Sequence, residues 1–237
     1  MIRVPMNVAR LLAAGLVLVP AVALARPKPS PWKSAVLKFD RLGGKLSIGV
    51  DKSKRRFLDA ALTSSKVTDA SLKGLADLVP GQQRVAHAVV ELAGTRITDK
   101  ALTELAKLGR KVPVALTLGK TGITDAGLKN LKGATITILA LDGTKVTDAG
   151  LKELKGLKGL SALSLSSTGV SDAGMKELKK LTLLQTLDLG GTKLTDVGLG
   201  ELKGLSRLRL LDLSKTAVTP AAVATFKKAL PKCKIIQ

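Results

Sequence analysis

Five copies of one unit decide the fold: TGITDAGL at 121–128, TKVTDAGL at 144–151, TGVSDAGM at 168–175, TKLTDVGL at 192–199 and TAVTPAAV at 216–223. Their first residues are 23, 24, 24 and 24 positions apart. Looser copies, SKVTDASL and TRITDKAL, begin at Ser65 and Thr95, with intervals of 30 and 26 residues. A constant period of roughly 20–50 residues is typical of proteins in which each unit stacks on the next. The sequence therefore predicts about seven stacked repeats over residues 58–232.

Each unit contains a strand pattern followed by a helix pattern. The apolar pairs that alternate with other residues, as in short strands, are Leu116/Leu118, Leu139/Leu141, Leu163/Leu165, Leu187/Leu189 and Leu211/Leu213. Leucines then recur at three-residue spacing after each TDAGL-type segment, which is typical of amphipathic helices.

The starts of these helices also have a sequence signature. The residues suited to cap them are Thr124, Thr147, Ser171 and Thr195, and each is followed by an aspartate in the positive first turn. In the last unit Thr219 is followed by Pro220, which is tolerated at the first helical position because its missing N–H would be unpaired there.

The combined pattern, LxxLxLxxTxVTDAGLKxLxxL, resembles the leucine-rich-repeat family, in particular the Thr/Cys-type repeats of F-box substrate receptors and of exported bacterial proteins. The resemblance covers about residues 58–237. It implies an α/β right-handed solenoid, a horseshoe with a parallel β-sheet on its concave side and α-helices on its convex side. It also implies protein recognition without chemistry of its own. The sequence departs from the family in carrying Thr where many members carry Asn or Cys, and in lacking an F-box.

The regions outside the repeats have patterns of their own. Residues 1–25 are predicted to be a secretory signal peptide, because Arg3 and Arg10 precede an apolar run and Ala23-Leu24-Ala25 fits a cleavage site. An uncleaved anchor is the alternative, although the run is shorter than the roughly 20 residues that a membrane-spanning helix needs. We expect a Pro- and Lys-rich linker at 26–33, an N-terminal cap helix and strand within 34–57, and a C-terminal capping strand at 233–237. Export to the periplasm or the cell exterior, with one cysteine and hence no internal disulfide, suggests a bacterial source.

The chain is strongly basic, with 39 Lys and Arg against 18 Asp and Glu and a formal net charge of +21. Loss of Arg3 and Arg10 with the signal peptide would lower this charge to +19. Such a charge favours anionic envelope polymers or lipid head groups as partners, although lysines also simply solubilise a surface. The lysines expected to form a basic convex face on the helices are Lys129, Lys152, Lys155, Lys176, Lys179 and Lys203. No specific nucleic-acid partner is expected.

Strand parity separates the core from the concave surface, since residues that flank the inward leucines point the other way. The concave residues predicted to bind a partner are Glu91, Thr117, Ile138, Ala140, Ser164, Asp188, Leu210 and Asp212. These positions hold no aromatic residue and no Arg, which are the usual anchors of protein interfaces. An undecorated structural sheet is therefore the alternative interpretation of this face.

No catalytic residue, cofactor or metal site is expected. His87 and Cys233 are single residues of their kind and lie far apart in the sequence, so no nucleophile and base are paired. His87 aligns with core leucines of later repeats and is predicted to be packed, and Cys233 is predicted to be a core thiol. The repeated aspartates, which would stack about 4.8 Å apart, allow a calcium ladder, but helix capping explains them without a metal. The sequence thus predicts a non-enzymatic, exported interaction module with a protein partner. An adhesin for cell-envelope polyanions, acting through the basic helices, is the alternative, and the oligomeric state is not predicted.

Overall fold

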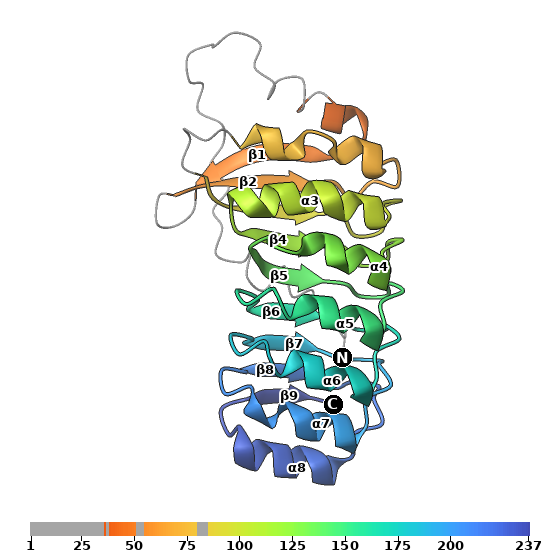
Figure 1. Ribbon diagram of the computed structural model, residues 1–237, viewed down its shortest axis with the longest axis vertical. Helices are drawn as coiled ribbons and strands as arrows, with labels where there is room; N and C mark the ends of the chain where they lie inside the picture. Colours follow the sequence, from red (N-terminus) through yellow and green to blue (C-terminus); the bar gives the residue numbers. More distant parts are fainter. Residues whose placement is uncertain (1–35, 37, 51–54, 80–84) are drawn as a thin grey trace, which may run out of the picture.

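The repeats stack into a single sheet that is covered on one face by helices (Figure 1). The computed structural model describes residues 36, 38–50, 55–79 and 85–237, so the expected signal peptide and linker lie outside the described residues. Within these ranges, nine strands follow one another in chain order across the sheet, from β1 to β9. The predicted α/β solenoid of leucine-rich-repeat type is confirmed.

The strands are short and spaced by one repeat. They are β1 (Lys45–Val50), β2 (Arg56–Ala61), β3 (Val85–Glu91), β4 (Val114–Thr117), β5 (Ile136–Ala140), β6 (Ala162–Ser164), β7 (Thr186–Asp188), β8 (Leu210–Asp212) and β9 (Lys234–Ile236). From β2 onward every neighbouring pair is parallel. The first pair, β1 and β2, is antiparallel, so the N-terminal end of the sheet is a hairpin rather than another repeat.

The helices differ in length along the stack. They are α3 (Asp99–Lys111), α4 (Asp125–Leu128), α5 (Asp148–Leu154), α6 (Asp172–Leu178), α7 (Asp196–Glu201) and α8 (Pro220–Ala229). The 3-10 turns are η1 (Asp69–Leu72), η2 (Leu75–Leu78), η3 (Lys129–Leu131) and η4 (Leu202–Gly204). The 13-residue α3 belongs to the repeat with the 26-residue interval. In the preceding repeat the described helical segments are two 3-10 turns.

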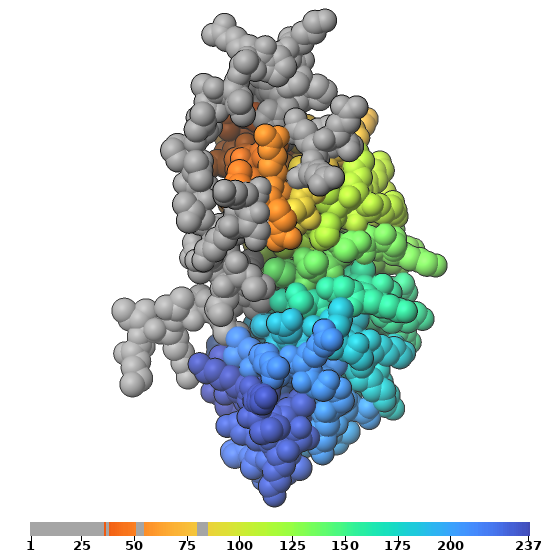
Figure 2. Space-filling model, turned by 90° about the vertical axis from the view of Figure 1, so that its left-hand side faces the viewer, coloured from red at the N-terminus to blue at the C-terminus, as the bar shows by residue number. Residues whose placement is uncertain are grey.

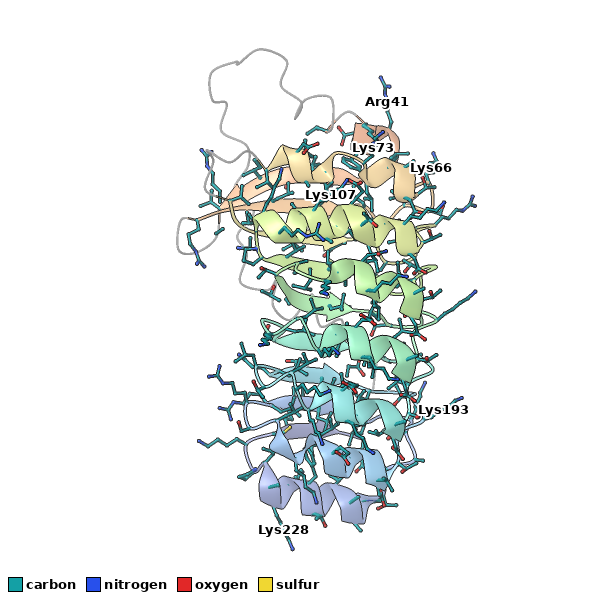
Figure 3. The ribbon with its side chains drawn as sticks, in the orientation of Figure 1. Arg41, Lys66, Lys73, Lys107, Lys193 and Lys228 are labelled. Atoms are coloured by element: carbon teal, nitrogen blue, oxygen red, sulfur yellow. The ribbon has the colours of Figure 1, made fainter. Side chains whose placement is uncertain are left out.

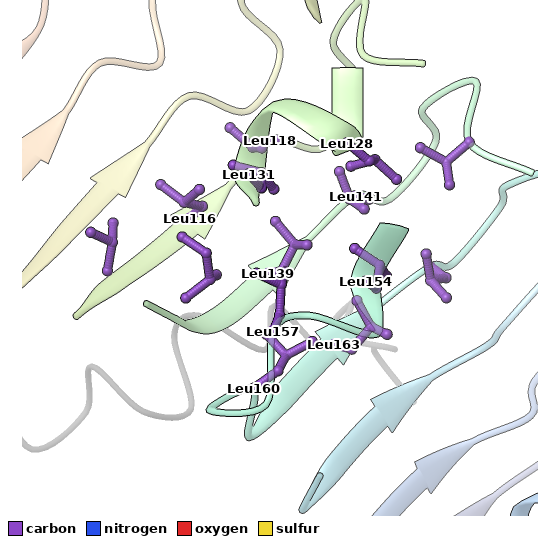
Figure 4. Close-up of a cluster of buried hydrophobic side chains, with 14 of the residues drawn as sticks. Leu116, Leu118, Leu128, Leu131, Leu139, Leu141, Leu154, Leu157, Leu160 and Leu163 are labelled. Atoms are coloured by element: carbon purple, nitrogen blue, oxygen red, sulfur yellow. The ribbon is translucent and has the colours of Figure 1, made fainter. Parts of the chain in front are cut away.

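The core is a continuous row of aliphatic side chains between the sheet and the helices (Figure 4). Leu139, Leu163, Leu187 and Leu211 are partners on adjacent parallel strands, and each is fully buried. Leucines of the helices, such as Leu154, close the row from the other side. Because burying one such side chain contributes about 2 kcal/mol before chain entropy is subtracted, the stability of each repeat depends on its neighbours.

One threonine in each of six repeats fixes the turn that follows the strand. The Oγ1 atoms of these threonines donate hydrogen bonds of 2.6 Å to the carbonyl oxygen three residues earlier; they are Thr95, Thr121, Thr144, Thr168, Thr192 and Thr216. A hydroxyl is suited to this largely buried position because it finds a hydrogen-bond acceptor within its own turn, where carbonyl oxygens such as those of Leu92 and Leu141 also accept from the threonine N–H.

The two ends of the array close the core differently. At the N-terminal end, Phe39 and Leu46 of the predicted cap are buried against the first repeats. At the C-terminal end, Cys233 is buried just before β9, and Ile235 packs on the core in register with Leu211. The molecule is elongated, and its segments follow one another along the long axis in sequence order (Figure 2).

Candidate functional site on the concave face

The strand register places the eight predicted concave residues in two neighbouring rows. Glu91, Thr117, Ala140, Ser164, Asp188 and Asp212 are successive partners across β3 to β8. Ile138 and Leu210 belong to the next row, which runs through Val89, Ala115, Ile138, Ala162, Thr186 and Leu210. We call the surface formed by these two rows the concave face. One row is mostly apolar and the other becomes acidic toward the C-terminal end.

A carboxylate that sequence reasoning missed completes an acidic group on this face. Asp142 follows β5, and its Oδ1 accepts a hydrogen bond from the Ser164 hydroxyl. The Ser164 hydroxyl also lies 3.2 Å from Oδ2 of Asp188. Parity could have found Asp142, because residues 138, 140 and 142 alternate on the same side beyond the end of the strand. We call Asp142, Ser164, Asp188 and Asp212 the acidic group.

Among the three carboxylates of the acidic group, Asp188 is the buried one. Its side chain is buried, with Oδ1 accepting from the Gly190 N–H at 2.9 Å. The pKa of Asp188 is raised to about 6, chiefly by burial and also by the nearby carboxylates of Asp212 and Asp142, against the lowering effect of its hydrogen bonds. Asp188 is therefore a carboxyl group that changes charge near neutral pH.

The repeated aspartates at the helix starts lie away from the concave face and have a structural task. Asp148 illustrates it: Oδ1 accepts from the Ser171 N–H at 2.8 Å, and Oδ2 accepts from the Ser171 hydroxyl at 2.6 Å. The same pair of bonds joins Asp69 to Thr98, Asp99 to Thr124, Asp125 to Thr147, Asp172 to Thr195 and Asp196 to Thr219. Each aspartate thus binds the capping residue of the next repeat, and we call this arrangement the Asp–Thr clamp.

The capping residues complete the clamp within their own repeat. The hydroxyl oxygens of Thr124, Thr147, Ser171 and Thr195 each accept from the backbone N–H two residues later, at 3.3–3.4 Å. Thr219 accepts from the Ala222 N–H at 3.2 Å, with Pro220 at the first helical position. The predicted caps are therefore confirmed, and the hydroxyl that caps one helix also donates to the aspartate of the repeat before it.

The glycine of the TDAGL segment makes room for the clamp. At Gly198, a Cβ would meet Oδ1 of Asp172 and would lie 2.9 Å from the Asp172 Cα. Gly127, Gly150 and Gly174 face the clamp aspartates of their preceding repeats in the same way. The motif Thr-Asp-x-Gly thus encodes a contact between repeats as well as a helix start.

The remaining candidate residues for chemistry have packing roles in the structure. His87 lies in β3 beside Phe57, with the two rings stacked at a centroid distance of 5.2 Å. The prediction that His87 replaces a core leucine is wrong, because β3 begins at Val85 and the strand alternation turns His87 to the face of Val89 and Glu91. Burial raises the pKa of the Cys233 thiol, which disfavours the nucleophilic thiolate.

The predicted basic lysines are all exposed on the helical side of the solenoid. They are Lys129, Lys152, Lys155, Lys176, Lys179 and Lys203. Lys179 pairs with Glu201 at 3.2 Å and thereby links two successive helices. Other cations, among them Lys193 at the edge of the stack and Lys228 on α8, project from the body (Figure 3). Positive charge is therefore spread over several sides of the molecule.

Within the described ranges, no three His, Cys, Asp or Glu side chains are placed to hold a metal ion together. The helices of those ranges are also too short or too polar to span a membrane.

Comparisons with known proteins agree with this geometry. A family model described as "Leucine Rich repeat" matches residues 180–203. The structure is similar to that of internalin C2 from Listeria monocytogenes, with 25% sequence identity and a TM-score of 0.55 over 76% of this chain and 69% of that one. A leucine-rich-repeat protein of Leptospira interrogans is a more distant match, with 21% identity and a TM-score of 0.44 over 67% of this chain and 51% of that one. No curated protein sequence matches the chain.

Proposed function

We propose that this chain, which has the fold of a leucine-rich-repeat protein, binds another protein through its concave face and catalyses no reaction. The observation that supports this proposal best is the division of the concave face into an apolar row and a row that ends in acids. A face with these two properties offers both area for burial and charge for orientation of a partner. The packing roles of His87 and Cys233 support a binding rather than a catalytic task.

We further propose that the protein is exported and works in the periplasm or outside the cell of a bacterium. The predicted signal peptide at residues 1–25 supports this location, and the similarity to internalin C2 of Listeria monocytogenes supports a bacterial source. Detection of the mature chain in an envelope or culture fraction, with an N-terminus after Ala25, would test it. A chain found only in the cytoplasm would contradict it.

Capture of the partner from the native source tests the binding proposal. Purified protein carrying Asp188→Lys and Asp212→Lys is compared with the wild type after chemical crosslinking, and co-purifying proteins are identified. We expect a partner that is retained by the wild type at moderate salt and lost by the double variant. A variant with Lys152→Glu on α5 and Lys155→Glu directly after it changes two charges on the other face and should retain the partner. Equal recovery by the wild type and the concave variant would place the binding surface elsewhere.

An envelope adhesin is the second candidate function, and the exposed helix lysines are the observation that favours it. Binding of this kind is expected to weaken steeply as salt screens the charges. Retention on heparin or on vesicles with anionic lipids should then fall sharply between low and high salt and should be reduced by Lys152→Glu and Lys155→Glu. Salt-independent retention would exclude this candidate.

A further inference from the structure

The acidic group is unusual in a chain with such an excess of positive charge. Among the ion pairs within the described residues, none includes Asp142, Asp188 or Asp212. The charged groups that act on Asp188 are the carboxylates of Asp212 on β8 and Asp142 after β5. Within the part of the chain that the structure describes, these three carboxylates therefore repel one another and none of them is paired with a cation.

A count of hydrogen atoms shows that the acidic group lacks a donor. The Ser164 hydroxyl carries one hydrogen, yet it lies within hydrogen-bonding distance of both Asp142 and Asp188. If both aspartates are ionised, the hydroxyl satisfies only one of them. The other oxygen, on a buried side chain, then needs a proton or an external donor, and leaving it without one is costly.

The chemistry of the missing donor is that of a Lys or Arg side chain. Such a side chain brings several N–H donors and a positive charge, so it would satisfy the free oxygen and relieve the repulsion among the carboxylates. Beside the acidic group, Ile138 and Leu210 are half-buried in the apolar row. In an extended peptide, side chains two residues apart lie on the same face, about 6.8 Å from each other. A cationic and an apolar side chain at this spacing can therefore reach both rows.

We propose that the concave face over β5 to β8 binds an extended, lysine- or arginine-bearing segment of the partner protein, with one cationic side chain held between Asp142, Asp188 and Asp212. This inference rests on the proposed protein-binding function and specifies the chemistry of the partner. The same site takes up a proton when the cation is absent, with Asp188 donating to Ser164 and Ser164 donating to Asp142. Proton and partner therefore compete for the acidic group.

The test uses the full chain and two labelled probes, a serine-based pentapeptide with valine at position 2 and lysine at position 4, which share one face when extended, and a matched pentapeptide with glutamine in place of the lysine. Binding is followed by fluorescence anisotropy between pH 5 and pH 7.5. We expect the lysine probe to bind the wild type more tightly as the pH rises through about 6, because the raised pKa of Asp188 keeps this carboxyl neutral below that range. The glutamine probe should bind at least about tenfold more weakly at pH 7.5.

The matched variants are Asp188→Asn in the acidic group and Glu153→Gln, which removes one exposed negative charge on α5. Asp188→Asn should weaken binding of the lysine probe about tenfold or more at pH 7.5 and abolish its pH dependence. Glu153→Gln should bind like the wild type. Circular dichroism and thermal melts confirm that both variants are folded.

Equal binding of the lysine probe by the wild type and Asp188→Asn, or equal binding of the two probes, would overturn the inference. Competition by Ca²⁺ at the same low concentration as the probe would do so as well, because it would indicate a metal site. The proposed function has a separate test: a captured partner that is lost with Asp188→Lys and Asp212→Lys upholds concave binding even if the lysine probe does not bind.

Discussion

Asp188 couples the charge of the concave face to the stability of the fold. Its pKa is about 6 in the folded chain against an ordinary value of 3.8, so the folded state holds its proton more tightly than the unfolded state. The resulting stabilisation is complete below pH 3.8 and is lost as the pH rises through about 6. Asp188→Asn should therefore raise the free energy of unfolding at pH 7.5 by about 1–3 kcal/mol and flatten its decline between pH 4 and pH 6.

Urea unfolding at several pH values checks this prediction, with Glu153→Gln as the control for removal of a negative charge at an exposed site. The control should keep the pH dependence of the wild type. A stability difference between Asp188→Asn and the wild type that stays constant from pH 4 to pH 7.5 would show that the burial of Asp188 does not govern its titration.

Single residues were predictable where the physical reason is local. Thr147 was predicted to cap a helix because a hydroxyl that precedes a helical pattern can accept from a free backbone N–H of the first turn. The structure confirms this cap. The aspartate that follows each cap was assigned to the helix dipole, but its hydrogen bonds go to the next repeat. That task depends on which residues meet across repeats, and a sequence pattern alone does not contain those distances.

At the scale of one helix, α7 offers a matched pair of glycines. A Cβ at Gly198 would meet the clamp aspartate Asp172, whereas a Cβ at Gly200 would have no atom within 4 Å. Gly198→Ala should therefore destabilise the chain by roughly 1–3 kcal/mol through overpacking against a fixed carboxylate and backbone. Gly200→Ala should stabilise it by up to about 1 kcal/mol, because alanine is the better helix former. Thermal or urea unfolding of the two variants measures both effects.

The opposite signs are the essential feature of this pair. A neutral or stabilising effect of Gly198→Ala would contradict the close packing of α7 against Asp172 of the preceding repeat. The sequence alone did not predict this close approach. The 24-residue period and the leucine spacing locate strands and helices, but they do not give the distance between successive helices. The 3-10 turns η1 and η2 were not predicted either, because the N-terminal copies match the repeat pattern only loosely.

At the scale of the whole molecule, the repeats should behave as a chain of nearest-neighbour contacts. Removing one clamp in the middle of the stack, with Asp148→Ala, deletes both hydrogen bonds to Ser171. We expect a loss of about 2 kcal/mol, typical of hydrogen bonds to a charged group. Hydrogen exchange should accelerate most in α5 and α6, which flank the broken clamp.

Asp77→Ala is the control for Asp148→Ala, because Asp77 is exposed and its ion pair among the described residues is a 3.6 Å contact with Lys111. Its stability should change by less than about 0.5 kcal/mol. Uniform acceleration of exchange over all repeats after Asp148→Ala would contradict a nearest-neighbour description and would indicate a single cooperative unit.

The architecture of the whole was the most predictable feature, because a strand-plus-helix unit cannot bury its apolar side without neighbours. The alignment of Leu163, Leu187 and Leu211 on adjacent parallel strands follows from that requirement. The antiparallel pairing of β1 with β2 was not predicted, since the two strands share no repeat pattern. The acidic group was only partly predicted, because Asp142 lies beyond the end of its strand.

Site-specific photocrosslinking tests most directly whether the concave face binds the partner. A photoreactive residue is placed at Ile138 on the concave face or at Lys152 on α5, and the native source is irradiated. Binding on the concave face predicts a defined protein adduct from position 138 that Asp188→Lys and Asp212→Lys abolish, and no such adduct from position 152. An adduct that forms from position 152 and not from position 138 would contradict it.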